Sequence, residues 1–308
     1  MMLKNARDMG LFGIGTLQAW RIIGRVKPDV VFIKGGYVGL PVGIAAKRRG
    51  VPIVTHDSDA LPGLTNRVLS RWSQVCAVTM PESCYSYPAS KMIRTGLPIG
   101  AQFAALASAP KQSLRRELGL SAHLPVVLIA PGSSGALVIN DALLDILPEL
   151  LKVQHVSIVH ITGVKNYQSV LSSYKRAGIE MTNIVVRPFV DNLHEYSRAA
   201  DIVVTRAGSM LIELAAQSCA VISVPNPYLT GGHQLKNASI YQKAKAVKIL
   251  SEEDLVANAA TLKKAIIELL DKPAERMRLG RALHAFYQPK AAEHIAKLLI
   301  EVAKSHGA

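Results

Sequence analysis

Short runs of apolar and β-branched residues alternate along this chain with longer amphipathic segments of helical length. This alternation is typical of a parallel sheet whose strands are connected by helices. In the first third of the chain it predicts strands at residues 30–33, 51–55 and 75–79 and helices at residues 16–26, 40–49 and 64–71. The first third therefore has an α/β pattern that begins with a helix.

Residues 98–111 are rich in Pro, Ala, Ser and Gly without periodicity, which predicts a linker. A second α/β pattern follows, with strands predicted at residues 126–130, 156–161, 184–186, 202–205, 221–224 and 247–250. The helices between them are predicted at residues 136–151, 167–177, 192–199, 210–217 and 234–244, and the chain is helical from residue 255 onward. We expect two α/β domains, 1–100 and 101–308, of which the second is doubly wound.

The first predicted domain is short for its class. It has three or four strands and lacks the opening strand and glycine loop with which such a domain normally starts. We therefore expect a first domain that is truncated at its N-terminus, with Met1 a candidate for a misplaced start.

The charge of the chain points to an anionic partner. Its 308 residues carry 36 Lys and Arg against 22 Asp and Glu, a formal net charge of +14. Residues 1–100 hold 13 of the basic residues against five acidic ones, so the excess is densest there. A nucleic acid, an acidic membrane surface or a phosphorylated ligand would each fit this charge.

Composition narrows these choices. Aromatic residues make up 5% and do not interleave with a basic run, which disfavours a nucleic-acid partner. The three cysteines have neither disulfide-framework nor zinc-site spacing, which favours a reducing cytoplasm. No stretch approaches the roughly 18 apolar residues of a membrane span.

Ligands of open parallel sheets bind beyond the carboxyl ends of the strands, so the loops after the strands are the candidate sites. Gly35 and Gly36 follow the first strand, where they allow close backbone approach to an anion, or form a plain strand-to-helix turn. His56, Asp57 and Asp59 follow the second strand. These side chains can exchange a proton or bind a sugar, or they can cap and pack the next helix.

Two loops of the second domain suit a diphosphate. The small-residue loop from Pro131 to Gly135 opens a helix and matches neither the GxGxxG nor the Walker A pattern. Arg206 follows the strand at 202–205, and Ser209 and Glu213 begin the next helix. An arginine there can neutralise a leaving diphosphate, while the alternative is a solvated loop arginine.

Four segments together are similar to the MurG family: residues 35–67, 131–136, 187–208 and 233–238. The resemblance runs from about residue 16 to the end of the chain. It implies the GT-B fold, with two Rossmann-like, doubly wound domains. The truncated first domain, 1–100, would lie on the acceptor and membrane side, and the second, 101–308, would bind the UDP-sugar, with its C-terminal helices packing back on the first. The resemblance also implies an inverting transfer of N-acetylglucosamine from its UDP derivative to undecaprenyl-diphosphate-linked N-acetylmuramyl-pentapeptide. This reaction converts lipid I to lipid II in peptidoglycan synthesis and so serves cell wall biogenesis, cell shape and cell division.

The resemblance also implies roles for individual residues. Ser133 would lie at the diphosphate, Phe189 and Val190 at the uracil, Arg206 with Ser209, Met210 and Leu211 at the phosphates, Glu213 at the ribose, and Gln234 with His233 and Asn237 at the sugar. Gly35, Gly36, Tyr37 and His56 would lie on the acceptor side, and Asp59 stands where the family has an amide that contacts the donor. Asp57 and Asp59 are the acid–base candidates, and neither a metal ion nor a cofactor is implied.

The family's first glycine-rich loop, which ends in a histidine, has no counterpart in this sequence. Gly100 stands where an arginine is usual, and the segment from Arg206 to Glu213 is one residue shorter than is common. A second hypothesis is therefore a non-catalytic UDP-sugar-binding remnant, or one half of a split glycosyltransferase.

Basic residues near the N-terminus surround apolar ones, which suits peripheral contact with anionic lipid at the inner face of the cell membrane, or else a solvated helix face. The basic residues are Lys4, Arg7, Arg21, Arg25 and Lys27, and the apolar ones are Leu11, Phe12, Leu17, Trp20 and Ile22.

Overall fold

The structure, a computed structural model, describes residues 2–132, 135–228 and 230–307 of the chain, without the side chains of residues 2–7 and 230. It consists of two compact units. Unit 1 comprises Met1–Pro98 and Gln288–Ala308, and unit 2 comprises Ile99–Tyr287. The last segment of the chain therefore belongs with the first unit and not with its neighbour in sequence.

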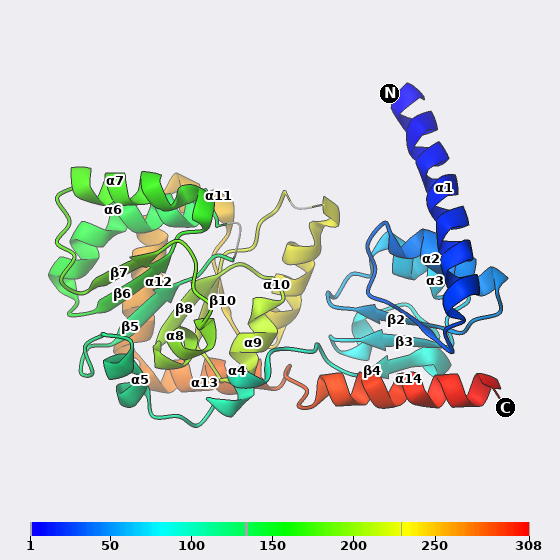
Figure 1. The fold of residues 1–308 in the computed structure, drawn as a ribbon. Coiled ribbons are helices and arrows are strands. Elements are labelled where there is room, and N and C mark those ends of the chain that lie inside the picture. The colour runs from blue at the N-terminus through cyan, green and yellow to red at the C-terminus, as the bar shows by residue number, and fades with distance from the viewer. Residues whose placement is uncertain (1, 133–134, 229, 308) are drawn as a thin grey trace. The chain divides into compact units, whose positions relative to one another are not determined.

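Unit 1 is built on a parallel sheet whose strands lie in sequence order, β1 (Val31–Ile33), β2 (Ile53–Asp57), β3 (Val75–Val78) and β4 (Met92–Arg94). Its helices are α1 (Met2–Val26), α2 (Gly39–Arg48), α3 (Leu64–Leu69) and α14 (Ala291–Gly307), with short 3-10 turns at Glu82–Cys84 and Ala89–Lys91. Figure 1 shows α2 and α3 on one side of this sheet and α14 on the other.

The two faces of the unit 1 sheet are separated by the alternation of side chains along a strand. Ile53 packs with Ala19 and Ile23 of α1 and with Leu69 of α3. The next residue, Val54, packs with Leu298 and Val302 of α14. A helix from the far end of the sequence thus completes the core of this unit.

Unit 2 holds a six-stranded parallel sheet in the order β10-β9-β8-β5-β6-β7. The strands are β5 (Val126–Ile129), β6 (Ser157–Ile161), β7 (Ile184–Arg187), β8 (Ile202–Thr205), β9 (Val221–Ser223) and β10 (Lys248–Ile249). Numbered within the unit, this order is the 3-2-1-4-5-6 arrangement of a Rossmann domain. The strand order reverses between β5 and β8, which is where such domains bind ligands.

Helices cover both faces of the unit 2 sheet (Figure 1). They are α4 (Ala101–Ala105), α5 (Lys111–Glu117), α6 (Leu137–Val153), α7 (Tyr167–Arg176), α8 (Leu193–Ala199), α9 (Met210–Ala216), α10 (His233–Lys243), α11 (Glu252–Ala257), α12 (Ala260–Asp271) and α13 (Pro273–His284), with 3-10 turns at Val164–Asn166 and Thr230–Gly232. Residues of α6, α7 and α12 share one large apolar core with alternate residues of the strands.

Two expectations from the sequence were wrong in detail. The segment predicted as a linker, residues 98–111, contains α4, because its alanines favour helix and Phe103 is buried at 5% exposure. The first helix begins at Met2 and not at residue 16. Glycines at 10, 13 and 15 obscured its periodicity without ending it, since a single glycine costs a helix only about 1 kcal/mol.

A search of the described residues finds no helix both long and apolar enough to cross a membrane.

Candidate functional site

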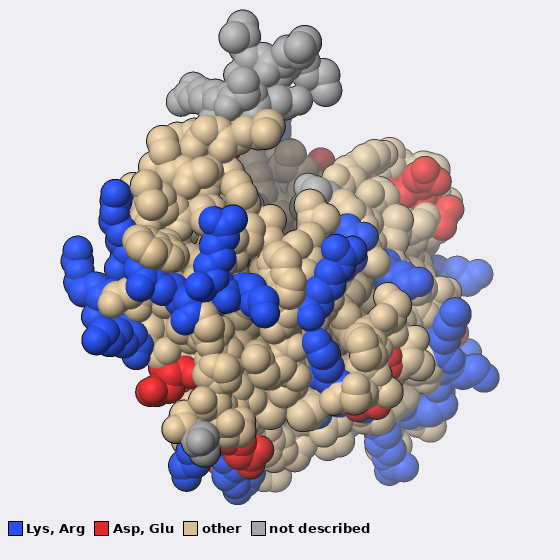
Figure 2. All heavy atoms as spheres, turned by 90° about the vertical axis from the view of Figure 1, so that its right-hand side faces the viewer, with Lys and Arg blue, Asp and Glu red and all other residues tan. Residues whose placement is uncertain are grey.

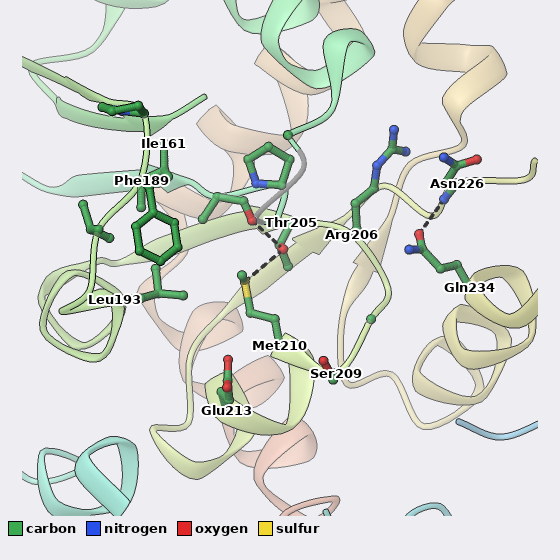
Figure 3. Close-up of a pocket in the computed structure, with 17 residues that line it drawn as sticks. Ile161, Phe189, Leu193, Thr205, Arg206, Ser209, Met210, Glu213, Asn226 and Gln234 are labelled. Carbon is green, nitrogen blue, oxygen red and sulfur yellow. Dashed lines mark hydrogen bonds between the residues drawn. The ribbon is translucent and has the colours of Figure 1, made fainter. Parts of the chain in front are cut away.

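A pocket of about 610 Å³ opens at the carboxyl ends of β5 and β8, where the strand order of unit 2 reverses. Figure 3 shows the side chains around it. The pocket is lined by Ala130, Pro131, Gly132, Gly135, Ile161, Pro188, Phe189, Val190, Leu193, Thr205, Arg206, Gly208, Ser209, Met210, Glu213, Asn226 and Gln234. Its walls therefore come from the loops after β5, β7, β8 and β9, as the topology dictates.

The two ends of the pocket differ in chemistry. Phe189 lies with Ile161 and Leu193 at one end, and Arg206, Asn226 and Gln234 lie toward the other (Figure 3). The Phe189 side chain is 51% exposed, which is high for a large apolar ring in a folded unit. This arrangement suits an elongated ligand with a flat ring at one end and a polar or anionic group at the other.

The loop after β5 reaches the start of α6 through two glycines in the left-handed region, Gly132 at φ +104° and Gly135 at φ +70°. A Cβ atom at Gly135 would lie 2.4 Å from the carbonyl oxygen of Thr162. The loop therefore packs against the end of β6 as closely as a glycine allows. Ser133, which the sequence assigns to this loop, lies outside the described residues.

Thr205, the last residue of β8, ties the two strands at the reversal point together. Its hydroxyl donates a 2.7 Å hydrogen bond to the carbonyl oxygen of Ala130, at the end of β5. This bond holds together the points at which the loops after β5 and β8 begin, and both loops line the pocket. Thr205 was not among the residues predicted from sequence, although it stands at a strand end, where ligand contacts are expected.

Arg206 lies at the pocket wall and is largely buried, with 12% of its side chain exposed. Its guanidinium forms a two-point ion pair with Glu252, at 3.1 Å and 3.2 Å, and donates a 3.0 Å bond to the carbonyl oxygen of Val224. Glu252 was also not predicted from the sequence, because it stands 46 residues from Arg206.

Glu213 lines the pocket from α9, one turn after Ser209. Burial raises the pKa of Glu213 above its ordinary value. A half-buried carboxyl group in this position can accept hydrogen bonds from ligand hydroxyls.

The side-chain amide of Gln234, at the start of α10, is fixed by a hydrogen bond to its oxygen. Oε1 accepts a 2.8 Å hydrogen bond from the backbone N–H of Asn226, which directs the amide across the polar end of the pocket (Figure 3). Asn226 also accepts a 2.8 Å bond from the N–H of Tyr228 through its side chain. Asn226 was not among the residues predicted from sequence.

Asp59, in unit 1, was also predicted to contact the donor and is not among the residues that line this pocket. Three predicted donor residues of unit 2 that the structure describes do not line it either. Leu211 is fully buried, and Asn237 is 2% exposed and donates a 3.1 Å bond to the carbonyl oxygen of Ala207. Asn237 therefore supports the Arg206 loop from behind. His233 begins α10 but is absent from the pocket lining.

The predicted acceptor-side residues of unit 1 lie at the carboxyl ends of β1 and β2. Gly35 and Gly36 adopt φ of +80° and +74°, and Tyr37 beside them is 88% exposed. Thr65 donates a 2.7 Å bond to the carbonyl oxygen of Gly36. The glycine turn is therefore fastened to α3 while its tyrosine faces outward.

His56 is completely buried on β2. Its Nε2 lies 2.9 Å from the carbonyl oxygen of Gly96, so this nitrogen carries the proton and donates. Burial lowers the pKa of His56. The ring is thus held neutral inside unit 1.

Asp57 is 4% exposed, and both of its carboxylate oxygens accept hydrogen bonds. Asn66 donates to Oδ1 at 2.9 Å, and Tyr87 donates to Oδ2 at 2.8 Å. Burial raises the pKa of Asp57, and these bonds oppose the rise. Asp59, two residues on, is less buried, and its carbonyl oxygen accepts a 2.9 Å bond from Tyr85.

Both units of the chain are similar to known proteins. Residues 126–297 match the glycosyltransferase family 28 C-terminal domain, and residues 1–78 match the N-terminal domain of the same family. A UDP-N-acetylglucosamine–N-acetylmuramyl-(pentapeptide) pyrophosphoryl-undecaprenol N-acetylglucosamine transferase from Moorella thermoacetica is 33% identical over 98% of this chain and 81% of its own length. The protein of the same name from Halalkalibacterium halodurans is 34% identical over 99% and 82%.

The chain belongs to the MurG family, within glycosyltransferase family 28. The crystal structure of Acinetobacter baumannii MurG matches it with a TM-score of 0.72 and 26% identity, over 93% of this chain and 77% of that one. A putative UDP-N-acetylglucosamine 2-epimerase from Listeria monocytogenes has a TM-score of 0.68 at 12% identity, over 92% and 77%, a likeness of fold alone. The predicted GT-B fold, two Rossmann-like α/β domains with parallel sheets, is confirmed for this MurG-family protein.

No group of three or more His, Cys, Asp or Glu side chains placed to hold a metal ion occurs among the residues that the structure describes.

Proposed function

We propose that this protein transfers N-acetylglucosamine from its UDP derivative to the lipid-linked N-acetylmuramyl-pentapeptide, the reaction named for its relatives. The pocket at the reversal point of the unit 2 sheet is the observation that carries this proposal. Its aromatic end suits the uracil and its Arg206 end suits the diphosphate. Donor binding thus falls to unit 2 and acceptor binding to unit 1.

We assign the donor contacts as the family resemblance implies, for the residues that line the pocket. Phe189 and Val190 bind the uracil, Glu213 accepts hydrogen bonds from the ribose hydroxyls, and Gln234 binds the sugar. Arg206 binds the diphosphate together with the backbone at Ser209 and Met210. Leu211 and Asn237, which are buried behind this surface, support it without touching the ligand.

The proposed reaction is a single inverting displacement. The C4 hydroxyl oxygen of the muramyl sugar forms a bond to the anomeric carbon, and the bond from that carbon to the UDP oxygen breaks. The hydroxyl proton passes to a base, and UDP leaves with the electron pair. Arg206 and the N-terminus of α6 stabilise the charge that develops on the diphosphate.

We assign the acid–base role to Asp59 in preference to Asp57. The carboxylate of Asp57 is buried and bonded to Asn66 and Tyr87, which fits a residue that holds the loop after β2 in shape. Full transferase activity in an Asp57→Asn, Asp59→Asn double variant would rule out either carboxylate as the base. Loss in Asp59→Asn with retention in Asp57→Asn is the expected result.

The test of the proposed function is incubation with labelled UDP-N-acetylglucosamine and a lipid I analogue, scoring donor affinity and product separately. Arg206→Ala should lower kcat/KM by about a hundredfold, the size of effect seen when a group that stabilises transition-state charge is removed. Arg281→Ala, on the exposed surface of α13, is the matched control and should keep full activity. Donor binding without any product would instead support the non-catalytic, sugar-nucleotide-binding hypothesis.

We propose in addition that unit 1 docks on an anionic membrane through α1, at the inner face of the cell membrane. Phe12, Leu17 and Trp20 of α1 are exposed and border an apolar hollow of about 520 Å³ that Arg48 also lines. The guanidinium of Arg49 lies 3.7 Å above the Trp20 ring. Basic side chains outnumber acidic ones on the face seen in Figure 2. Exposed apolar groups together with basic side chains favour binding to anionic lipid.

Sedimentation with vesicles tests this docking. The protein should bind vesicles containing phosphatidylglycerol and not those of phosphatidylcholine alone, and Leu17→Glu should weaken binding. Ile300→Glu makes the same change at an exposed position of α14 and should leave binding intact. Equal binding to both vesicle types would contradict the docking proposal and leave the transferase proposal standing.

A further inference from the structure

Glu252 is linked to the donor pocket through Arg206. It lies at the first position of α11, just after β10, and is not among the residues that line the pocket. Its two carboxylate oxygens accept bonds from Nη1 and Nη2 of Arg206 at 3.1 Å and 3.2 Å. Of this pair, the arginine therefore lines the pocket and the glutamate stands behind it in the chain of contacts.

The guanidinium of Arg206 joins the carboxyl ends of three neighbouring strands. Arg206 follows β8, Val224 follows β9, and Glu252 lies three residues beyond β10. The bonds to Val224 and Glu252 use three of the five N–H groups of the guanidinium, and the other two, on Nε and Nη2, have no hydrogen-bond partner among the residues that the structure describes. Because the planar fork is fixed at three points, the direction of the remaining donors is fixed as well.

Glu252 is itself held in place by its helix. Ser251 caps α11, and its Oγ accepts a 2.9 Å bond from the backbone N–H of Asp254. Only 10% of the Glu252 side chain and 12% of the Arg206 side chain are exposed. The ion pair is therefore rigid and largely shielded from solvent. A solvated surface ion pair, by contrast, contributes little to stability.

We propose that Glu252 is a positioning residue for the donor diphosphate. It holds Arg206 in the orientation that the diphosphate requires, so that the ligand does not have to order a flexible side chain on binding. This inference rests on the proposed function, because it takes the pocket to bind a nucleoside diphosphate. It concerns the phosphate end of the pocket and leaves the aromatic end around Phe189 unaffected.

The test compares UDP with uridine, which lacks the phosphates, by isothermal titration on the whole chain. Glu252→Ala should weaken UDP binding about tenfold, the fold-change for immobilising one long side chain. Uridine binding should stay within about twofold, whereas a general loss of structure would weaken both ligands equally. Glu252→Asp keeps the charge but shortens the side chain, so its UDP affinity should lie between that of the wild type and that of Glu252→Ala.

The control is Glu253→Gln, at the exposed neighbouring position, which should leave both affinities unchanged. In an Arg206→Ala background, adding Glu252→Ala should cause no further loss of UDP affinity, because the glutamate acts through the arginine. Glu252→Gln, which keeps the size of the side chain, replaces the alanine variant if the latter does not fold.

The outcomes separate this inference from the function on which it rests. If the wild-type protein binds UDP but Glu252→Ala retains or exceeds that affinity, the positioning role is overturned and the proposed function stands. Parallel weakening of UDP and uridine also overturns the positioning role. If the wild-type protein binds no UDP, both proposals fall.

Discussion

The phenolic hydroxyl of Tyr87 donates a 2.8 Å hydrogen bond to Oδ2 of Asp57, across 30 residues of sequence, inside unit 1. Asn66 donates to the other oxygen of the same carboxylate and also to the carbonyl oxygen of His56. The loop after β2, which carries the acid–base candidates, is therefore held by a buried polar network. Networks of this kind are sensitive to the loss of one partner, because the remaining groups stay buried without a bond.

Tyr87→Phe should destabilise unit 1 by about 1–3 kcal/mol, since Oδ2 of Asp57 loses its donor in a buried site. It should also raise the pKa of Asp57 further. Both tryptophans of the chain, Trp20 and Trp72, belong to unit 1, so urea unfolding followed by tryptophan fluorescence reports on this unit. Tyr37→Phe, at an exposed tyrosine, is the control, and an equal loss in both variants would contradict the prediction.

Gly135→Ala should weaken UDP binding at least tenfold. The new methyl group would lie 2.4 Å from the Thr162 oxygen and 2.5 Å from Nδ2 of Asn166, so the loop after β5, which lines the pocket, must shift away from these two residues. Gly178→Ala is the matched control, because Gly178 also has a positive φ but nothing within 4 Å. That control shares the backbone strain without the clash and should keep its UDP affinity in the same titration.

The same substitution should have opposite effects at two helical glycines. Gly280→Ala in α13 would place a methyl group 2.1 Å from the carbonyl oxygen of Ser218 and should destabilise unit 2 by about 1–3 kcal/mol. Gly13→Ala in α1 meets nothing within 4 Å and should stabilise its helix by up to about 1 kcal/mol. Thermal unfolding followed by circular dichroism measures both, and a stable Gly280→Ala variant would refute the close packing of α13.

Acid should destabilise unit 2 through His160. This histidine is fully buried between Tyr174 and Asn140, at 2.8 Å and 3.0 Å, and burial lowers its pKa from 6.5 to about 3. Between these two values the unfolded chain binds a proton that the folded chain does not. Stability is therefore fully present above pH 6.5 and falls as the pH drops toward about 3.

The pH dependence of the free energy of unfolding between pH 4 and pH 7 checks this expectation. His160→Gln should flatten the slope through that range, although it lowers stability overall by removing a buried network. His123→Gln, at an exposed histidine, should leave the slope as in the wild type. An unchanged slope in His160→Gln would mean that other groups cause the acid sensitivity.

Local pattern was a good guide to the elements of unit 2. The strand at 202–205 was predicted to the residue, and the strand at 126–130 to within one. These strands are buried on both faces, so their sequences are continuous apolar runs bounded by turn residues. Helix α4 was missed because only five residues form it, too few for a helical period to register.

The sequence by itself determined the α/β class, the parallel sheets and the loops at which a site had to lie, because these follow from periodicity and from the rule that parallel strands end at one edge. Tertiary structure decided which side chains of those loops reach the pocket. Leu211 and Glu213 stand two residues apart on α9, yet one is buried and the other lines the pocket. Tertiary structure also decided two pairings, that of Arg206 with Glu252 and that of Asp57 with Tyr87. Each pairing joins segments that only folding brings together.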